Sequence, residues 1–120
     1  MIPHDDYLDA FHSPVVDRLT TATPPDRWEL PGGVLRLPRV FGFCRGVKRA
    51  LAMAEKAASQ HNPATGRFVL LGEIIHNPWV NDHFRHLGAN ILSPDERKPE
   101  VIDQHLAPND TAVIPAFGVP

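Results

Sequence analysis

The sequence predicts an α/β fold in which helices alternate with the strands of a parallel sheet. Short apolar runs of strand type recur at 68–71, 89–92 and 111–116. Segments with helical periodicity lie at 47–60 and 79–87. Strands that alternate with helices pack as a parallel sheet, because each helix carries the chain back so that the next strand runs in the same direction.

The helix expected at 47–60 has the clearest pattern. Its apolar residues recur at spacings of three and four, which places them on one helix face. They are Val47, Ala50, Leu51, Ala54, Ala57 and Ala58. The shorter helix at 79–87 turns Val80, Phe84 and Leu87 inward, and Gly88 is well placed to cap it.

The chain is expected to divide at residue 34. Residues 1–33 are interpreted as an N-terminal extension, in part a candidate for disorder, in which Pro14 would interrupt a short helix. The α/β domain then spans 34–120, with a first strand at 34–40 and one or two helical turns at 100–106. Pro31-Gly32-Gly33, just before it, is a turn signal.

Composition excludes several classes of protein. The chain has 120 residues, a net charge of −2 and a single cysteine, so neither a disulfide scaffold nor a basic nucleic-acid surface is indicated. No apolar run is long enough to span a bilayer, and the first residues are acidic rather than signal-like. The cytoplasm is therefore the expected compartment, with no nucleic acid or membrane as partner.

Cys44 is the most distinctive candidate for chemistry. It lies between Gly42 and Gly46 at an expected strand-to-helix turn. The positive end of a helix favours a thiolate, which is the form that ligates metal or attacks an electrophile. Glycines let the backbone approach a bulky ligand closely. A small buried hydrophobic residue is an equally good interpretation of a lone cysteine.

His76 follows two β-branched residues and precedes Asn77-Pro78, which places its ring just past a strand end. There it could bind an anion or move a proton, although a loop histidine bonded to backbone is the commoner case. His83 and His86 share a helix face, but no fourth ligand supports a zinc site with His76.

Basic residues gather around the Cys44 turn and could attract phosphate, or could simply form a solvated face. They are Arg36, Arg39, Arg45, Lys48 and Arg49.

Together these segments resemble the LytB-type reductases over residues 34–120. Residues 42–50 match the family's Gly-Phe-Cys-x-Gly-Val-x-Arg-Ala stretch at every fixed position, and 74–78 fit its His-Asn loop. The third family loop has the form Ala-His-Gly-Val, and 116–119 read Ala-Phe-Gly-Val here.

The resemblance implies one of three α/β domains around a [4Fe–4S] cluster. It implies Cys44 as a cluster ligand and His76 as a ligand of the allylic diphosphate, with Gly42, Gly46 and Gly118 shaping the loops. Phe117 stands where a second diphosphate-binding histidine is expected. The implied reaction removes the hydroxyl of 4-hydroxy-3-methylbut-2-enyl diphosphate, with electrons from ferredoxin or flavodoxin.

The single cysteine is the main departure from the family, because the cluster needs two further thiolates. The chain is therefore expected to be an incomplete reductase, inactive alone and without an assigned catalytic residue of its own. A non-enzymatic α/β module that binds a phosphorylated ligand is the main alternative. A thiol enzyme that uses Cys44 with a histidine is a weaker one.

Overall fold

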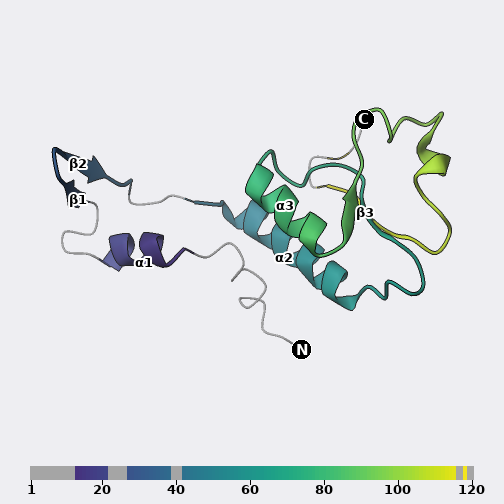
Figure 1. Cartoon of the computed structure of the whole chain (residues 1–120), viewed down its shortest axis with the longest axis horizontal. Coiled ribbons are helices and arrows are strands. Elements are labelled where there is room, and N and C mark those ends of the chain that lie inside the picture. The colour runs from purple at the N-terminus through teal and green to yellow at the C-terminus, as the bar shows by residue number, and fades with distance from the viewer. Residues whose placement is uncertain (1–12, 22–26, 39–41, 116–117, 119–120) are drawn as a thin grey trace.

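The computed structural model describes residues 13–21, 27–38, 42–115 and 118. Its secondary structure falls into two groups (Figure 1). The first holds helix α1 (Pro14–Thr21) and strands β1 (Arg27–Leu30) and β2 (Gly33–Arg36). The second is an α/β unit that begins with α2 (Arg45–Gln60).

The α/β unit is built on a three-stranded parallel sheet in the order β4-β3-β5. In the central strand, Val69 pairs with Asn90 on one side and Ala112 on the other. The elements after α2 are β3 (Phe68–Leu70), α3 (Pro78–His86), β4 (Ala89–Ile91), the 3-10 turn η2 (Ile102–Gln104) and β5 (Thr111–Val113). The α/β fold with a parallel sheet is thus confirmed.

Both faces of the central strand are buried, as parallel sheets require. Phe68 and Leu70 pack in the main core with residues of α2 and α3, whereas Val69 and Leu71 turn to the opposite face. There the loop that contains η2 covers them with Ile102 and Leu106. Figure 1 shows α2 and α3 together on one side of the sheet and this loop on the other.

The strand expected at 34–40 is wrong in both extent and partner. The strand covers Gly33–Arg36, and it pairs antiparallel with β1 rather than with the parallel sheet. Pro31 and Gly32 form the turn between them, where Gly32 has a φ of +92°. This partner is adjacent in sequence, so little chain entropy opposes its pairing, whereas β3 already has a neighbour on each side.

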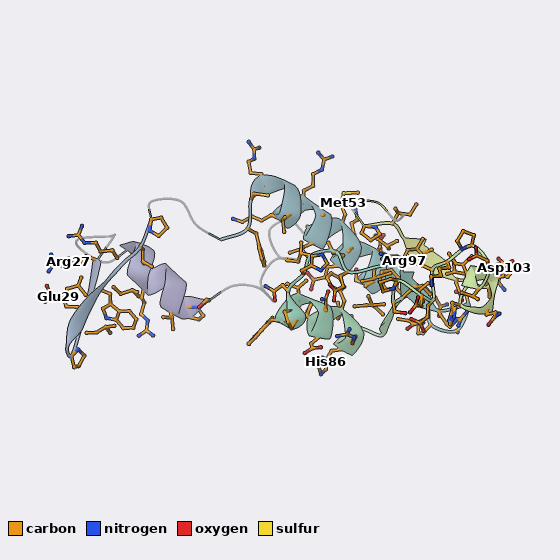
Figure 2. The ribbon with its side chains drawn as sticks, turned by 90° about the horizontal axis from the view of Figure 1, so that it is seen from above. Arg27, Glu29, Met53, His86, Arg97 and Asp103 are labelled. Atoms are coloured by element: carbon orange, nitrogen blue, oxygen red, sulfur yellow. The ribbon has the colours of Figure 1, made fainter. Side chains whose placement is uncertain are left out.

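Pro14 begins helix α1 instead of interrupting it, as a proline in the first turn can, because its missing N–H would be unpaired there in any case. The division at residue 34 falls inside the β1–β2 hairpin, and as a domain boundary it stays a prediction. Figure 2 shows Arg27 and Glu29 of the hairpin apart from the side chains of the α/β unit.

The polar contacts that join distant segments of the α/β unit include those of Asp110 and His83. Asp110 accepts hydrogen bonds from the backbone N–H and the guanidinium of Arg67, which ties the loop before β5 to the start of β3. These bonds lower the pKa of Asp110 from 3.8 to about 2. On the helical side, His83 Nε2 lies 2.8 Å from Glu55 Oε1 and joins α3 to α2.

Candidate functional site

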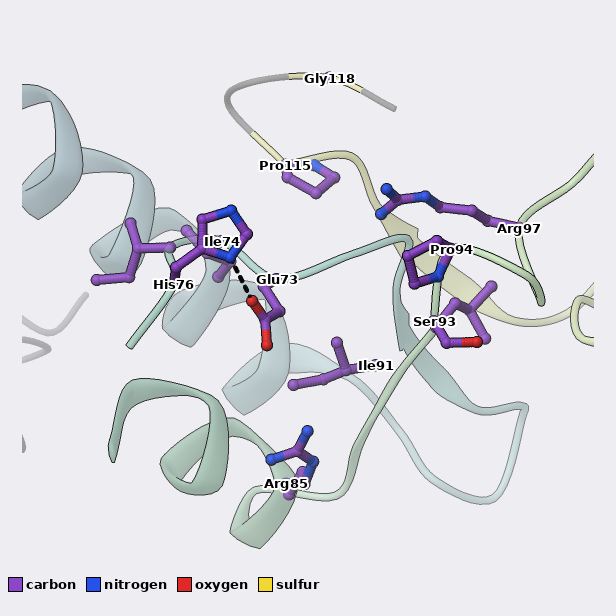
Figure 3. A pocket seen from close by; sticks show the side chains of 12 residues that line it. Glu73, Ile74, His76, Arg85, Ile91, Ser93, Pro94, Arg97, Pro115 and Gly118 are labelled. Carbon is purple, nitrogen blue, oxygen red and sulfur yellow. Dashed lines mark hydrogen bonds and ion pairs between the residues drawn. The ribbon is translucent and has the colours of Figure 1, made fainter. Parts of the chain in front are cut away.

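A cavity of about 500 Å³ lies at the carboxyl edge of the parallel sheet (Figure 3). The loop after β3 contributes Glu73 and His76, and the loop after β4 contributes Ser93 and Arg97. The chain beyond β5 closes the cavity with Pro115 and Gly118, and Arg85 reaches it from α3. Ligands of open α/β sheets bind at this edge, because loops from several strands meet there.

His76 lines the cavity and is anchored by a carboxylate. Its Nδ1 lies 2.7 Å from Glu73 Oε2, and its side chain is 98% exposed. With the proton on Nδ1, the ring donates to Glu73 and leaves Nε2 for a ligand; the protonated ring donates from both nitrogens. Glu73 therefore orients the ring without occupying the nitrogen that a ligand would contact.

Asn77 sets the position of His76 by starting helix α3. Its Oδ1 accepts hydrogen bonds from Trp79 N at 3.0 Å and Val80 N at 3.3 Å, and Pro78 occupies the first helical position. An asparagine cap followed by proline is a strong signal for a helix start. His76 is the residue just before this cap, so the start of α3 fixes its backbone at the point where the loop after β3 becomes helix.

Cys44 caps the N-terminus of α2, and its thiol is exposed and outside any disulfide. The backbone N–H of Val47 donates to its Sγ at 3.5 Å. Gly42, with a φ of +89°, provides the backbone turn ahead of it. Gly46 lies inside the first turn of α2, where a methyl group would make ordinary contact with Sγ at 3.9 Å.

The structure does not bring all of the predicted residues together. Within the described chain, the lining of the cavity includes His76 and Gly118 but not Cys44. Arg45, Lys48 and Arg49 of the basic run are exposed on α2 and also lie outside that lining. Phe117 lies outside the described residues. No group of three or more potential metal ligands occurs among the described side chains.

Sequence reasoning missed the part of the site that follows β4. Ser93 and Glu96 form a reciprocal pair: Ser93 N–H donates to Glu96 Oε2 at 2.8 Å, and Glu96 N–H donates to Ser93 Oγ at 3.4 Å. The backbone N–H of Ser93 is the main reason that the pKa of Glu96 is lowered. The pattern Ser-x-x-Glu is a known capping box, so Ser93-Pro94-Asp95-Glu96 could have been found as a turn with defined geometry.

Comparisons with known proteins agree with the motifs. A family model described as "LytB protein" matches residues 35–120. The chain is 41% identical over 92 residues to 4-hydroxy-3-methylbut-2-enyl diphosphate reductase of Gloeobacter violaceus, covering 72% of this chain and 21% of the relative. It is 39% identical over 84 residues to the protein of the same name from Parasynechococcus marenigrum, covering 70% and 20%.

The chain thus spans about a fifth of the length of the curated relatives that it matches. No solved structure matches it. None of the helices in the described part of the chain has the length and apolar character needed to cross a bilayer. The match to the family model covers the α/β unit, the Cys44 turn and the His76 loop, and the chain belongs to the LytB family.

Proposed function

We propose that this chain supplies one cluster thiolate and one diphosphate-binding histidine to a 4-hydroxy-3-methylbut-2-enyl diphosphate reductase. The complete protein would take up two electrons and two protons, release the substrate hydroxyl as water, and yield isopentenyl and dimethylallyl diphosphate. The observation that carries the proposal is the cavity at the carboxyl edge of the sheet, where Glu73 orients His76.

Cys44 is suited to hold one corner of a [4Fe–4S] cluster. Its sulfur is exposed, and the helix that it caps places partial positive charge beside it. The cluster, when bound, would supply the electrons for the reduction. One thiolate is too few for such a cluster, so the remaining ligands would come from other parts of the complete protein.

His76 would hold the diphosphate end of the substrate. The hydrogen bond to Glu73 restricts the ring, so less rotational entropy is lost when the protonated ring donates from Nε2 to a phosphate oxygen. The electron donor would be a small redox protein such as ferredoxin or flavodoxin, and the location would be the cytoplasm. Phe117, which replaces an expected histidine, is proposed to form part of the wall around the substrate.

The test of the cluster ligand is Cys44→Ser in the complete protein. The variant should fold normally but lose most of its iron, because a hydroxyl is a harder and poorer ligand for iron–sulfur clusters. Met53→Leu is the matched control, because it removes an exposed sulfur side chain from the same helix. Iron and sulfide content, the visible spectrum and circular dichroism are measured without oxygen. Full iron content in the serine variant would exclude Cys44 as a ligand.

The test of the diphosphate ligand is His76→Ala in the complete protein. The KM for the diphosphate substrate should rise by about ten- to a hundredfold, since a hydrogen bond to a charged group contributes about 1.5–3 kcal/mol. The cluster spectrum should stay unchanged. His86→Ala is the control, because that ring bonds to the backbone carbonyl of Asp82 and does not line the cavity. If His76→Ala and His86→Ala have the same KM, His76 does not bind the diphosphate.

A further inference from the structure

Arg97 is a cation in the cavity that has no counterion among the described residues. It is partly buried, yet no ion pair joins its guanidinium to a carboxylate of the described residues. Nη1 donates one hydrogen bond, to the Leu71 carbonyl at 3.3 Å, and the buried Nε has no partner in the described chain. Burying a charge without a partner is costly, so such a group points to an anionic ligand.

The other charged groups that line the cavity are already paired. Arg85 Nη1 lies 2.8 Å from Asp82 Oδ1, and Glu73 is bonded to His76. The positive charge of Arg97 is therefore the one that the described lining leaves without a carboxylate. Figure 3 shows its side chain extending toward the cavity from the side opposite to the His76 ring.

Two local features hold Arg97 in this position. The Ser93–Glu96 capping box fixes the turn on which Arg97 lies, and Arg97 N–H donates to the Ser93 carbonyl at 3.3 Å. Gly72, just past the end of β3, leaves the space that Nη1 occupies, because a Cβ at this position would collide with that nitrogen. A turn and a glycine from two different strand ends thus place a guanidinium at the carboxyl edge of the sheet.

We infer that Arg97 binds a phosphate group of the ligand, opposite His76. A guanidinium presents a planar set of donors that matches phosphate oxygens, and its Nη2 lies outside the bond to Leu71. Arg97 would supply a donor that Phe117 lacks. The inference rests on the proposed function in one respect, which is the identity of the anion as the diphosphate of an allylic substrate. The site itself is inferred from the contacts of Arg97 in this chain.

Inorganic pyrophosphate is the probe for the 120-residue chain. Calorimetry and the NMR signals of Gly72 and the Arg97 side chain follow the titration at constant ionic strength. We expect saturable binding that weakens about tenfold or more in Arg97→Gln. Lys98→Gln is the matched control: it removes the same charge from the same turn, where Nζ pairs with Asp95 at 2.6 Å outside the cavity lining.

Equal weakening in both variants, or no saturable binding at millimolar pyrophosphate, would overturn the inference. Arg97→Lys is measured in parallel and keeps the charge if the glutamine variant does not fold. It should bind more weakly than the original chain, because a lysine presents a point charge in place of a planar fork. Unchanged affinity in Arg97→Lys together with an unfolded Arg97→Gln would also count against the site.

The complete protein separates this inference from the proposed reaction. There, Arg97→Gln should raise the KM for the diphosphate substrate with little change in kcat, because the contact with phosphate is equally strong in the bound substrate and in the transition state. Normal turnover and KM in the variant would refute the role of Arg97 and leave the reductase intact. An inactive complete protein whose pyrophosphate binding still depends on Arg97 would refute the reductase and leave the phosphate site.

Discussion

The β1–β2 hairpin and the α/β unit both carry large apolar residues on their strands, but they bury these residues to very different extents. The hairpin leaves its large apolar residues between 41% and 46% exposed. These are Trp28, Leu30, Val34 and Leu35. In the α/β unit, by contrast, Phe68, Val69 and Leu70 of the central strand are at most 3% exposed, with helices on one face and a loop on the other.

This difference shows that two strands of this chain can pair without contributing much to the stability of the fold. A tight turn is enough to align two short neighbouring strands, but an isolated two-stranded hairpin is marginally stable in water. A strand contributes to stability in proportion to the apolar area that it removes from water. The cavity at the carboxyl edge therefore rests on the α/β unit, and the hairpin should affect it little.

The largest effect that separates the two regions should come from aromatic truncation. Phe84→Ala removes a side chain that is 0% exposed and should lower the free energy of unfolding by about 3–5 kcal/mol. Trp28→Ala removes a larger ring from the hairpin, yet it should cost less than about 1 kcal/mol. Urea denaturation of the 120-residue chain measures both. Equal losses would mean that the hairpin packs into the cooperative unit.

Acid should reveal a second difference between the regions. The folded-state pKa of Asp110 lies near 2, below its usual 3.8, so the carboxylate stabilises the fold above pH 3.8, and this contribution is lost as the pH falls toward 2. Asp110→Asn should therefore be less stable than the original chain at neutral pH, with a gap that closes over this range. Denaturation midpoints against pH give the test.

The control for this measurement is Glu29→Gln in the hairpin. Glu29 pairs with Arg27 at 3.0 Å, but the two side chains are 76% and 40% exposed, and exposed pairs contribute little. Its denaturation midpoint should follow that of the original chain at every pH. A Glu29 variant that loses as much stability as the Asp110 variant would contradict the contrast.

The smallest effect on the whole molecule should come from the hairpin turn. Gly32 has a φ of +92°, so Gly32→Ala should disfavour the turn by about 1–2 kcal/mol, because Cβ crowds the backbone there. NMR signals of Trp28 and Leu35 should change while the denaturation midpoint of the α/β unit stays constant. Gly33→Ala, at a position without positive φ, is the matched control. A lowered midpoint would show coupling between the two regions.

The sequence by itself determined the local structure of the α/β unit. Helical periodicity located α2 and α3, and apolar runs located the three strands of the parallel sheet. The position of Cys44 at the start of a helix and that of His76 in the loop before a helix also followed from the order of turn, cap and proline signals. These features depend on residues close together in the chain, whose preferences survive in the folded protein because the neighbours that set them are always present.

Only the tertiary structure decided which distant segments meet. The strand near residue 34 took β1 as its partner, and Glu73 and Arg97 reached the cavity from loops on two different strands. Periodicity shows which face of a helix or strand is apolar. It does not identify which two strands pair, or that the Arg97 side chain lies against Gly72. Those outcomes depend on competition among contacts far apart in sequence, which is resolved only when the whole core packs.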